Sequence, residues 1–315
     1  MPIEITRYTP QHKEEWDNFI RNSKNGTFLF YRDYMDYHSD RFTDCSLMFY
    51  KSGRLAALMP ANIRSGERIL QSHGGLTYGG LVMDGNTRTI DVLEIFDALK
   101  KYMREVLDAA TLQYKPLPYI YSRGASEEPL YALFRHGARV TARSISSTID
   151  TGHTIRFSEQ RTRCIRKALN AGVECGESQE LDAYWQILTE TLAVQHGCKP
   201  VHCVEEIKKL QKLFPENIKL YTATKEERTL AGVIVYETPE VAHLQYIAAS
   251  PEGKECGALD LLISHLIKDV YATKRYIDFG ISTEQGGTLL NEGLIHQKEG
   301  FGGRAVIYDT YELSI

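Results

Sequence analysis

At 315 residues, 43% of them hydrophobic, the chain is long enough for a large core, and its length favours about two domains. The formal net charge of −4 argues against broad, non-specific nucleic-acid binding but leaves room for a local basic groove. The N-terminal region holds no basic stretch followed by an apolar run, so we predict no secretory signal. The longest apolar runs are far shorter than the roughly 20 residues that cross a bilayer, so membrane insertion is not expected.

The cysteines form no C-x-x-C pair. In a chain of this size such spacing indicates reduced thiols rather than a disulfide framework or a zinc site. We therefore expect a cytoplasmic protein without a bound metal. The positions are Cys45, Cys164, Cys175, Cys198, Cys203 and Cys256.

The first half of the chain predicts helices and strands in alternation. Thr9 and Pro10 are typical of a helix N-cap followed by a first-turn proline. Ser-Gly pairs punctuate two strand-like runs, which predicts hairpins. The predicted order is a helix at 9–23, hairpin strands at 45–72, an amphipathic helix at 87–107, a strand at 117–122, a helix at 127–137 and a strand at 139–150.

The second half repeats this order. Two helices are each followed by a glycine suited to a C-cap, Gly172 and Gly197. The predicted elements are helices at 158–172 and 179–197, three strands within 217–250, a helix at 257–272, a strand at 275–282, a helix at 288–299 and a strand at 303–313. We therefore predict an α/β (α+β) protein with two tandem domains, 1–150 and 151–315, each a mixed, mostly antiparallel sheet flanked by helices.

The stretch "HLQYIAASPEGKECGALDLLISHL" (243–266) places a glycine-bearing segment between a strand and a helix. Gly253 and Gly257 would aim backbone N–H groups and the positive end of the helix at an anion, most commonly a phosphate, and Lys254 would add charge. The alternative is a strand-to-helix turn that uses glycine for its geometry only.

The order of elements resembles the second half of the GNAT acetyltransferase fold: three antiparallel strands, this segment and its helix, and a strand ending in "DFG". In that family a loop of the type Arg/Gln-x-x-Gly-x-Gly/Ala holds the pyrophosphate of acetyl-coenzyme A. The resemblance implies that Gly253, Lys254, Gly257 and Ala258 bind the donor. The match is approximate, because the glycines here are too widely spaced.

The stretch "DFGISTEQGGTLLNEGLIHQKEGFGGR" (278–304) resembles the C-terminal signature of the Fem-type peptidyltransferases and their acetyltransferase-like relatives. Those proteins consist of two GNAT-like domains in tandem. Similar patterns occur at "GTFLF" (26–30), "ALMPAN" (57–62) and "HGGLTYGGLV" (73–82), so the resemblance covers essentially the whole chain. The long helical arm with which some Fem enzymes recruit tRNA has no counterpart in the sequence.

The resemblance places Lys298 at the active site, where it would stabilise the carbonyl oxygen of a tetrahedral intermediate or hold a donor phosphate. The alternative is a lysine that reaches solvent at a helix end or neutralises helix carbonyls. In GNAT proteins the acyl carbonyl lies in a gap between two splayed parallel strands, which here would be 241–249 and 275–281. Tyr246, on the first of these strands, is a candidate donor to the oxyanion or leaving group, with core packing as the alternative.

Three further residues are candidates for proton transfer near Lys298. Glu284 and His296 are close in sequence, and Asp278 lies at the end of the buried strand. None of them has a partner that the sequence reveals.

Two segments are candidates for substrate binding. The resemblance implies that the loop 72–80 faces a cleft between the domains, where His73, Gly74 and Tyr78 would contact the acceptor; the alternative is a flexible connector. Arg163 and Arg166 belong to a basic helix suited to an anionic donor or acceptor, although most such charge runs are solvated faces.

We therefore expect an N-acyltransferase whose second domain binds an activated acyl donor, with acyl-coenzyme A preferred. The cleft between the domains would bind an acceptor with a free amine, such as an amino sugar or a cell-envelope precursor. One alternative is an aminoacyl-tRNA-dependent Fem-type peptidyltransferase. The other is a non-catalytic GNAT-like binding protein.

Overall fold

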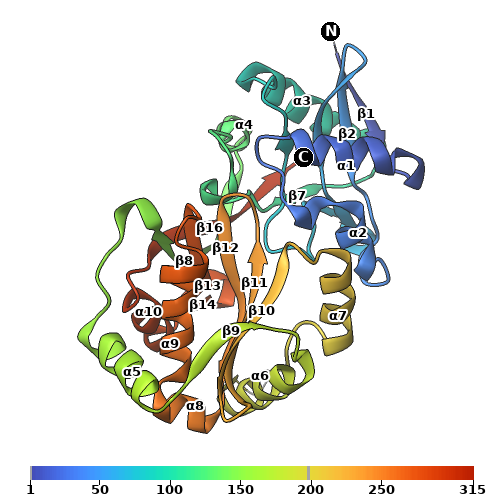
Figure 1. Cartoon of the computed structure of the whole chain (residues 1–315). Helices are drawn as coiled ribbons and strands as arrows, with labels where there is room; N and C mark the ends of the chain where they lie inside the picture. Colours follow the sequence, from blue (N-terminus) through green and yellow to red (C-terminus); the bar gives the residue numbers. More distant parts are fainter. Residues whose placement is uncertain (1, 197–198) are drawn as a thin grey trace. The chain divides into compact units, whose positions relative to one another are not determined.

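The computed structural model describes residues 2–196 and 199–315, and the chain forms two compact units (Figure 1). Unit 1 comprises Met1–Ser144, Thr283–Leu289 and Ile307–Ile315. Unit 2 comprises Ile145–Ser282 and Leu290–Val306. Each unit is therefore assembled from stretches that are separated in sequence.

The helices and strands alternate along the chain. Unit 1 contains β1 (Ile3–Arg7), α1 (Lys13–Asn22), α2 (Arg32–Met35), β2 (Leu47–Lys51), β3 (Arg54–Met59), β4 (Asn62–Arg64), β5 (Ile69–Gln71), β6 (Val82–Met83), α3 (Thr89–Glu105), β7 (Thr111–Tyr114) and α4 (Glu128–Arg135). Unit 2 contains α5 (Glu159–Asn170), β9 (Glu174–Ser178), α6 (Leu181–His196), α7 (Val204–Leu213), β10 (Ile218–Lys225), β11 (Arg228–Glu237), β12 (Val241–Ala249), α8 (Pro251–Cys256), α9 (Ala258–His265), β13 (Tyr276–Ile281) and α10 (Glu292–Glu299).

Two long strands carry the chain from one unit into the other, and a short ribbon lies between them in sequence. The long strands are β8 (Arg139–Asp150) and β16 (Arg304–Ser314), and the ribbon pairs β14 (Thr283–Glu284) with β15 (Leu289–Leu290). Single turns of 3₁₀ helix occur at Pro10–His12, Phe28–Phe30, Asp36–His38, Ser65–Glu67, Tyr119–Tyr121, Thr151–His153 and Gln285–Gly287, and α9 continues as a π-helical turn at Leu266–Val270.

Unit 1 is built around one amphipathic helix and two groups of strands. β1, β2, β3 and β6 form an antiparallel sheet, β4 pairs with β5, and β5 runs parallel to β7. The apolar stripe of α3, including Val92, Phe96 and Met103, is buried in the core cluster of this unit. Ile90, although apolar, lies in the first turn of α3 and is 69% exposed.

Unit 2 is a sheet in the order β8-β13-β12-β11-β10-β9, with helices on both faces. The pair β12/β13 is parallel and the other pairs within the unit are antiparallel. α9 packs on β10 and β11 and lies beside α5 (Figure 1). α6 packs on β11 and β12, where Gly232 leaves room for the ring of Tyr184. The predicted fold class, a mixed α/β protein, is confirmed.

The glycine-bearing segment before α9 is a helix and not the predicted loop. The Ser250 side chain accepts a hydrogen bond from the Gly253 N–H at 3.0 Å, and Pro251 occupies the first position of α8, so both residues favour a helix start. Gly257, with φ +83°, separates α8 from α9. A side chain at Gly257 would place its Cβ 2.4 Å from the carbonyl oxygen of Cys164 in α5. Gly257 therefore permits the close packing of α5 on this junction.

Two other local predictions are wrong. The predicted strand at 117–122 contains a 3₁₀ turn, because Pro116 and Pro118 lack the N–H groups that a ladder needs; the strand lies earlier, as β7. The helix predicted at 288–299 begins at Glu292, because the chain is still extended at Leu290, which is 43% exposed.

The last helix is followed by Gly300, whose φ of −61° is still helical. The left-handed residue is Gly302, with φ +92°. The N–H groups of Phe301, Gly302 and Gly303 bond back to the carbonyls of the last turn of α10.

The cysteines among the described residues carry free thiols, and Cys198 and the predicted helix stop Gly197 lie outside the described residues. No helix in the described part of the chain combines the length and apolar character needed to cross a membrane.

Candidate functional site

The most unusual feature of unit 2 is the parallel pair β12/β13, which separates part-way along its length. The two strands are in register at Val241–Tyr276, Ala242–Ile277 and His243–Asp278. The register ends at that third pair, although β12 continues to Ala249 and β13 to Ile281. The strands predicted to splay therefore do so, and they leave a wedge-shaped gap.

A bulge in each strand explains the separation. Ile234 of β11 faces Tyr246, but Val235 faces Leu244, so Gln245 is an extra residue in β12. Such a bulge bends the strand and redirects the side chains beyond it.

On the other side of the gap, β13 also carries one extra residue. Its register with β8 moves from Asp278–Thr148 to Ile281–Ser146, and Gly280 adopts φ +74° within that step. This left-handed conformation favours glycine and turns β13 away from β12.

A pocket of about 570 Å³ opens beside the gap, within the size range of small-molecule sites. Its walls are largely apolar, and its polar groups include two glutamines from α5 and α10. The lining residues come from α5, α6, β12, α8, α9, β13 and α10: Gln160, Arg161, Cys164, Thr191, Leu192, Leu244, Gln245, Ile247, Ala248, Ala249, Lys254, Leu259, Asp260, Ile263, Phe279, Leu294, Gln297, Lys298 and Phe301.

Lys298 is the buried cation of this pocket. Its Nζ donates hydrogen bonds to the carbonyl oxygens of Gly280 at 2.7 Å and Ile281 at 2.9 Å, the part of β13 that has left β12. Among the described residues these carbonyls are its hydrogen-bond acceptors, so one of the three ammonium N–H donors is left for a ligand. Burial lowers the pKa of Lys298 to about 8, and the nearby Asp278 carboxylate opposes that shift.

The residues predicted to hold a donor phosphate lie at one edge of the same pocket. Lys254 is exposed and lines it, whereas Gly253, Gly257 and Ala258 are buried in the α8–α9 junction. Two N–H groups of α8 are used internally: that of Gly253 by Ser250 Oγ and that of Lys254 by the Ser250 carbonyl.

The N-terminus of α9 also carries its own anion. Asp260, in the first turn, forms an ion pair with Arg161 of α5 at 2.7 Å, and both side chains are nearly buried. Burial raises the pKa of Asp260, while Arg161 opposes that shift. A carboxylate therefore occupies part of the end of α9 that would otherwise attract a phosphate.

Tyr246 lies close to the gap but does not line the pocket. Its hydroxyl is 2.5 Å from Nδ1 of His202, and its ring packs edge-on against Trp185 of α6. Because of the bulge at Gln245, Tyr246 is directed to the α6 side of the sheet. Burial raises the pKa of Tyr246 to about 12, so its hydroxyl is protonated at neutral pH.

Four other predicted site residues are on the surface. His296 is exposed on α10, and Arg163 and Arg166 are exposed on α5; none of them lines the pocket. Glu284 is exposed in β14, which belongs to unit 1.

The predicted acceptor loop, residues 72–80, is folded against unit 1. His73 and Tyr78 are each 3% exposed, and Gly74 donates its N–H to the side-chain oxygen of Asn62. The Tyr78 ring contacts that of Tyr121 with centroids 4.6 Å apart. These side chains contribute to the packing of their own unit.

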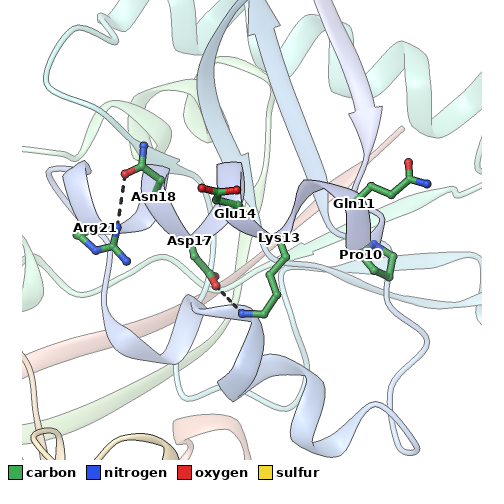
Figure 2. A pocket seen from close by; sticks show the side chains of 7 residues that line it. All are labelled: Pro10, Gln11, Lys13, Glu14, Asp17, Asn18 and Arg21. Atoms are coloured by element: carbon green, nitrogen blue, oxygen red, sulfur yellow. Dashed lines mark hydrogen bonds and ion pairs between the residues drawn. The ribbon is translucent and has the colours of Figure 1, made fainter.

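Unit 1 also has a hollow of about 540 Å³ along α1 (Figure 2). Its lining is polar apart from Pro10, and two of its cations already have partners: Lys13 bonds to Asp17 at 2.8 Å, and Arg21 bonds to Asn18 at 3.5 Å. It has neither the apolar walls nor the buried cation of the unit 2 pocket. Among the described residues, no three His, Cys, Asp or Glu side chains gather in a way that could hold a metal ion.

The part of the chain that forms the gap and the pocket is similar to a known protein family. Residues 156–285 match the family model described as acetyltransferase (GNAT) domain. This part of the chain is similar to a GNAT acetyltransferase domain. This domain contains most of the residues that form the gap and the pocket, and the predictions of a GNAT-like fold and of an acyltransferase are confirmed at that level. No curated protein matches the chain by sequence.

The solved structures extend the similarity beyond the GNAT domain to the whole chain. FemX superposes with a TM-score of 0.67 at 11% identity, covering 99% of this chain and 97% of FemX. L-PGS from Bacillus licheniformis gives 0.60 at 12% identity, covering 96% and 91%. A tandem GNAT protein from the clavulanic acid biosynthesis pathway gives 0.54 at 12% identity, covering 99% and 98%. At these identities the comparison shows a shared fold, the tandem GNAT-like arrangement predicted from the Fem-type resemblance.

Proposed function

We propose that the protein is an N-acyltransferase that holds an activated acyl donor in the unit 2 pocket, with the reacting carbonyl in the gap between β12 and β13. The observation that carries this proposal is the gap itself: it exposes strand N–H groups beside a pocket and a buried ammonium group. Preorganised donors aimed at a developing oxyanion often supply the largest part of catalysis.

The chain's own residues then have distinct roles. Backbone N–H groups of β12 beyond His243 face the gap and hold the carbonyl oxygen, and Lys298 stabilises negative charge through its remaining N–H. The amine nitrogen of the acceptor attacks the carbonyl carbon, the bond to the leaving sulfur or oxygen breaks, and the leaving group receives a proton. The apolar walls exclude water, which would otherwise hydrolyse the donor.

The first candidate donor is an acyl-coenzyme A thioester. The pocket is lined by α5, α8 and α9 and also by α6, and Lys254 stands at its edge, where a phosphate would enter. The GNAT domain match supports this donor class.

The second candidate donor is an aminoacyl ester of tRNA, which one observation favours. Asp260, paired with Arg161, occupies the end of α9 and would repel a pyrophosphate there. The structural similarity to FemX supports the same class, since the sequence resembles the Fem-type peptidyltransferases.

For the acceptor we propose an amine on a small molecule or a cell-envelope precursor. Contacts from His73, Gly74 and Tyr78, as well as from Arg163 and Arg166, stay predictions. The alternative of a non-catalytic binding protein is tested by the same transfer assay that tests the donor.

The test is transfer of radiolabelled acetyl from acetyl-coenzyme A, or alanine from alanyl-tRNA, to glucosamine and to lysine. We expect transfer by the wild type, and a loss of at least about tenfold in kcat/KM for Leu259→Trp, which fills the pocket from α9. Leu213→Trp, on the exposed side of α7, is the control. If the wild type transfers nothing from either donor, the proposal is wrong and a binding role takes its place.

Ligand-induced stabilisation separates the donors. A ligand that binds the folded state raises the melting temperature by mass action. A clear rise with coenzyme A supports the first candidate. No rise with coenzyme A, together with transfer from alanyl-tRNA, supports the second. Under the second candidate we expect Asp260→Asn to introduce coenzyme A binding that the wild type lacks.

A further inference from the structure

Unit 2 contains a second pocket, outside the candidate site. Its volume is about 620 Å³, within the size range of small-molecule sites, and it shares no lining residue with the pocket beside the gap. It is formed by the segment that precedes α5, by one face of α5, and by the π-helical turn that follows α9. All of these residues belong to unit 2.

The walls of the second pocket are largely apolar. Phe157 and Ile165 contribute from the start and the middle of one wall, and Ile267 contributes from the π-helical turn. Ile155 also lines the pocket and is 41% exposed, so a large apolar side chain is left open to solvent there. Such walls favour a ligand with an apolar body, because its burial removes apolar surface from water.

Two cations line the second pocket, and its lining includes no carboxylate. Arg156 precedes α5, and the ammonium of Lys268 lies 4.6 Å from the centroid of the Phe157 ring. Among the described residues neither cation has an acidic partner within ion-pair distance. Asp269, the neighbour of Lys268, pairs instead with His265 at 2.8 Å. The charge of the pocket is therefore complementary to an anion.

The hydroxyl groups of the second pocket narrow the choice of ligand further. Those of Thr151 and Thr162 donate to backbone carbonyl oxygens at 2.7 and 3.1 Å. A hydroxyl has one hydrogen to donate, so the side-chain donors left for a ligand are the two cations and Thr154. Arginine and lysine side chains donate and do not accept, and their strongest hydrogen bonds go to carboxylate and phosphate oxygens.

The wall that carries Arg156 is held by close backbone contacts with the end of α10. The Ser158 N–H bonds to the Gly300 carbonyl oxygen at 2.8 Å. A Cβ at Gly302 would lie 2.7 Å from the Ile155 carbonyl oxygen, so glycine is needed for this approach. The backbone of this wall is therefore preformed, which lowers the entropic cost of binding a ligand.

The π-helical turn Leu266–Val270 supplies another wall. Consecutive residues of a regular α-helix point about 100° apart. In this turn both Ile267, which is 7% exposed, and its neighbour Lys268 line the same pocket. Single π-helical turns are rare and occur frequently at functional sites. The turn brings an apolar and a basic side chain to one pocket.

We propose that the second pocket binds an anionic amphiphile, a small molecule with an apolar chain and a carboxylate or phosphate head. The chain lies against Ile155 and Ile267, and the head accepts hydrogen bonds from Arg156, Lys268 and Thr154. The site is separate from the proposed acyl transfer and does not depend on it.

The test is isothermal titration calorimetry with ligands that each share or lack one feature. The ligands are octyl phosphate, octanoate, octanol and inorganic phosphate, with the amphiphiles kept below their critical micelle concentrations. We expect the wild type to bind octyl phosphate or octanoate, and the tighter of the two identifies the preferred head group. Octanol lacks the charge and inorganic phosphate lacks the chain, so each should bind at least about tenfold more weakly.

Charge variants test the role of the two cations. Arg156→Gln combined with Lys268→Gln should weaken binding of the preferred anion at least about tenfold, since two charge-assisted hydrogen bonds are lost. The control is Lys209→Gln combined with Lys212→Gln. It removes the same net charge from exposed positions of α7 that line neither pocket, and it should change the affinity by less than about twofold.

Packing variants assign the binding to one pocket. Ala272→Trp fills the second pocket from an exposed position and should weaken binding at least about tenfold, because the chain loses its apolar contacts. Thr273→Trp, at the next exposed position and outside the lining, is the control. Leu259→Trp, which fills the pocket beside the gap, should leave the affinity unchanged.

Three results would overturn the inference. Octanol that binds as tightly as the anions would mean an apolar hollow without charge selection. Binding that Leu259→Trp abolishes, and that Ala272→Trp and the Arg156→Gln, Lys268→Gln variant retain, would place the ligand in the pocket beside the gap. No binding of either anion to the wild type at about 1 mM would mean that the pocket is not a site. Since no readout involves acyl transfer, each of these results leaves the proposed function intact.

Discussion

Each unit contains one parallel pair of strands, and the two pairs end differently. In unit 2, β12 and β13 separate after three register positions and leave a pocket beside them. In unit 1, β5 and β7 are also in register at three positions, but the chain itself then closes the end of the pair. The Ser72 N–H bonds to the Gln113 carbonyl, and the Gly79 N–H bonds to the Lys115 carbonyl.

The closure of the unit 1 pair depends on glycine. A Cβ at Gly79 would lie 2.0 Å from the Ser72 carbonyl oxygen, and one at Gly80 would lie 2.6 Å from the Tyr114 hydroxyl. The glycine-rich loop 72–80 therefore fits against the strand ends where unit 2 has two bulges and a gap. A parallel pair of strands is therefore closed by a loop in unit 1 and open to a ligand-sized pocket in unit 2. Glycine content alone does not identify the unit that carries the candidate site.

The largest expected effect comes from the lysines beside the two pairs. Lys298→Ala removes the buried ammonium from the gap, and we expect kcat/KM for acyl transfer to fall by about 100-fold or more, as for loss of an oxyanion donor. Lys115 is the counterpart: burial lowers its pKa, and its Nζ is 3.4 Å from the Leu76 carbonyl oxygen. Lys115→Ala should change kcat/KM by less than about threefold. Comparable losses from both substitutions would remove the distinction between the pairs.

The fit of the loop 72–80 against the ends of β5 and β7 can be tested by measuring the stability of glycine variants. Gly79→Ala forces a methyl group into the Ser72 carbonyl, and we expect the free energy of unfolding in urea to fall by about 2 kcal/mol or more, at the upper end of overpacking effects. Gly85→Ala, where a Cβ would meet nothing within 4 Å, is the control and should change it by less than about 0.5 kcal/mol. If Gly79→Ala is as stable as the control, the loop 72–80 does not pack closely against the ends of β5 and β7.

The pKa of Lys298 gives a pH dependence that unit 1 should not share. Transfer requires the ammonium form, so kcat/KM should decline as the pH rises through about 8. Stability should move the other way. The pKa is lower in the folded state than the ordinary 10.5, so between these values the unfolded chain binds more protons, and the free energy of unfolding rises with pH.

The reference for that pH dependence is Lys298→Met. Urea unfolding at a series of pH values should show wild-type stability increasing relative to this variant between pH 8 and 10.5. A constant difference across that window would show that Lys298 is not the source.

The smallest effect is expected for the exposed arginines of α5. Arg163→Ala with Arg166→Ala should alter transfer from acetyl-coenzyme A by less than about threefold, because neither side chain lines the pocket. With alanyl-tRNA as donor, the same double substitution should weaken tRNA binding, and the loss should depend on salt concentration, since phosphate contacts release counterions. Measuring KM at two salt concentrations separates these outcomes.

Reading the sequence identified the fold class, most helices and the strands that separate, because apolar periodicity and the order of elements are local signals. It also selected Lys298. It did not identify Gln245 or the Asp260–Arg161 pair, because each depends on a cross-strand register or on a partner about 100 residues away. A bulge leaves no local mark in a strand such as β12, where alternation simply changes phase after Gln245.

The glycine segment 253–257 shows why a motif alone was insufficient. Its glycines match a phosphate loop in composition, but Ser250 and Pro251 initiate a helix there. The deciding signal was therefore the capping pair just before the motif.

The discontinuous make-up of the units has a consequence for synthesis. β7 spans Thr111–Tyr114, yet its antiparallel partner at Tyr311–Ser314 is translated only after all the elements from α4 to α10. Unit 1 thus reaches its native pairing only after nearly all of unit 2 has been translated, and until then one edge of β7 remains without its native strand. Fragments truncated after β8 should accordingly be prone to aggregation, so activity assays and expression trials alike call for a chain that includes β16.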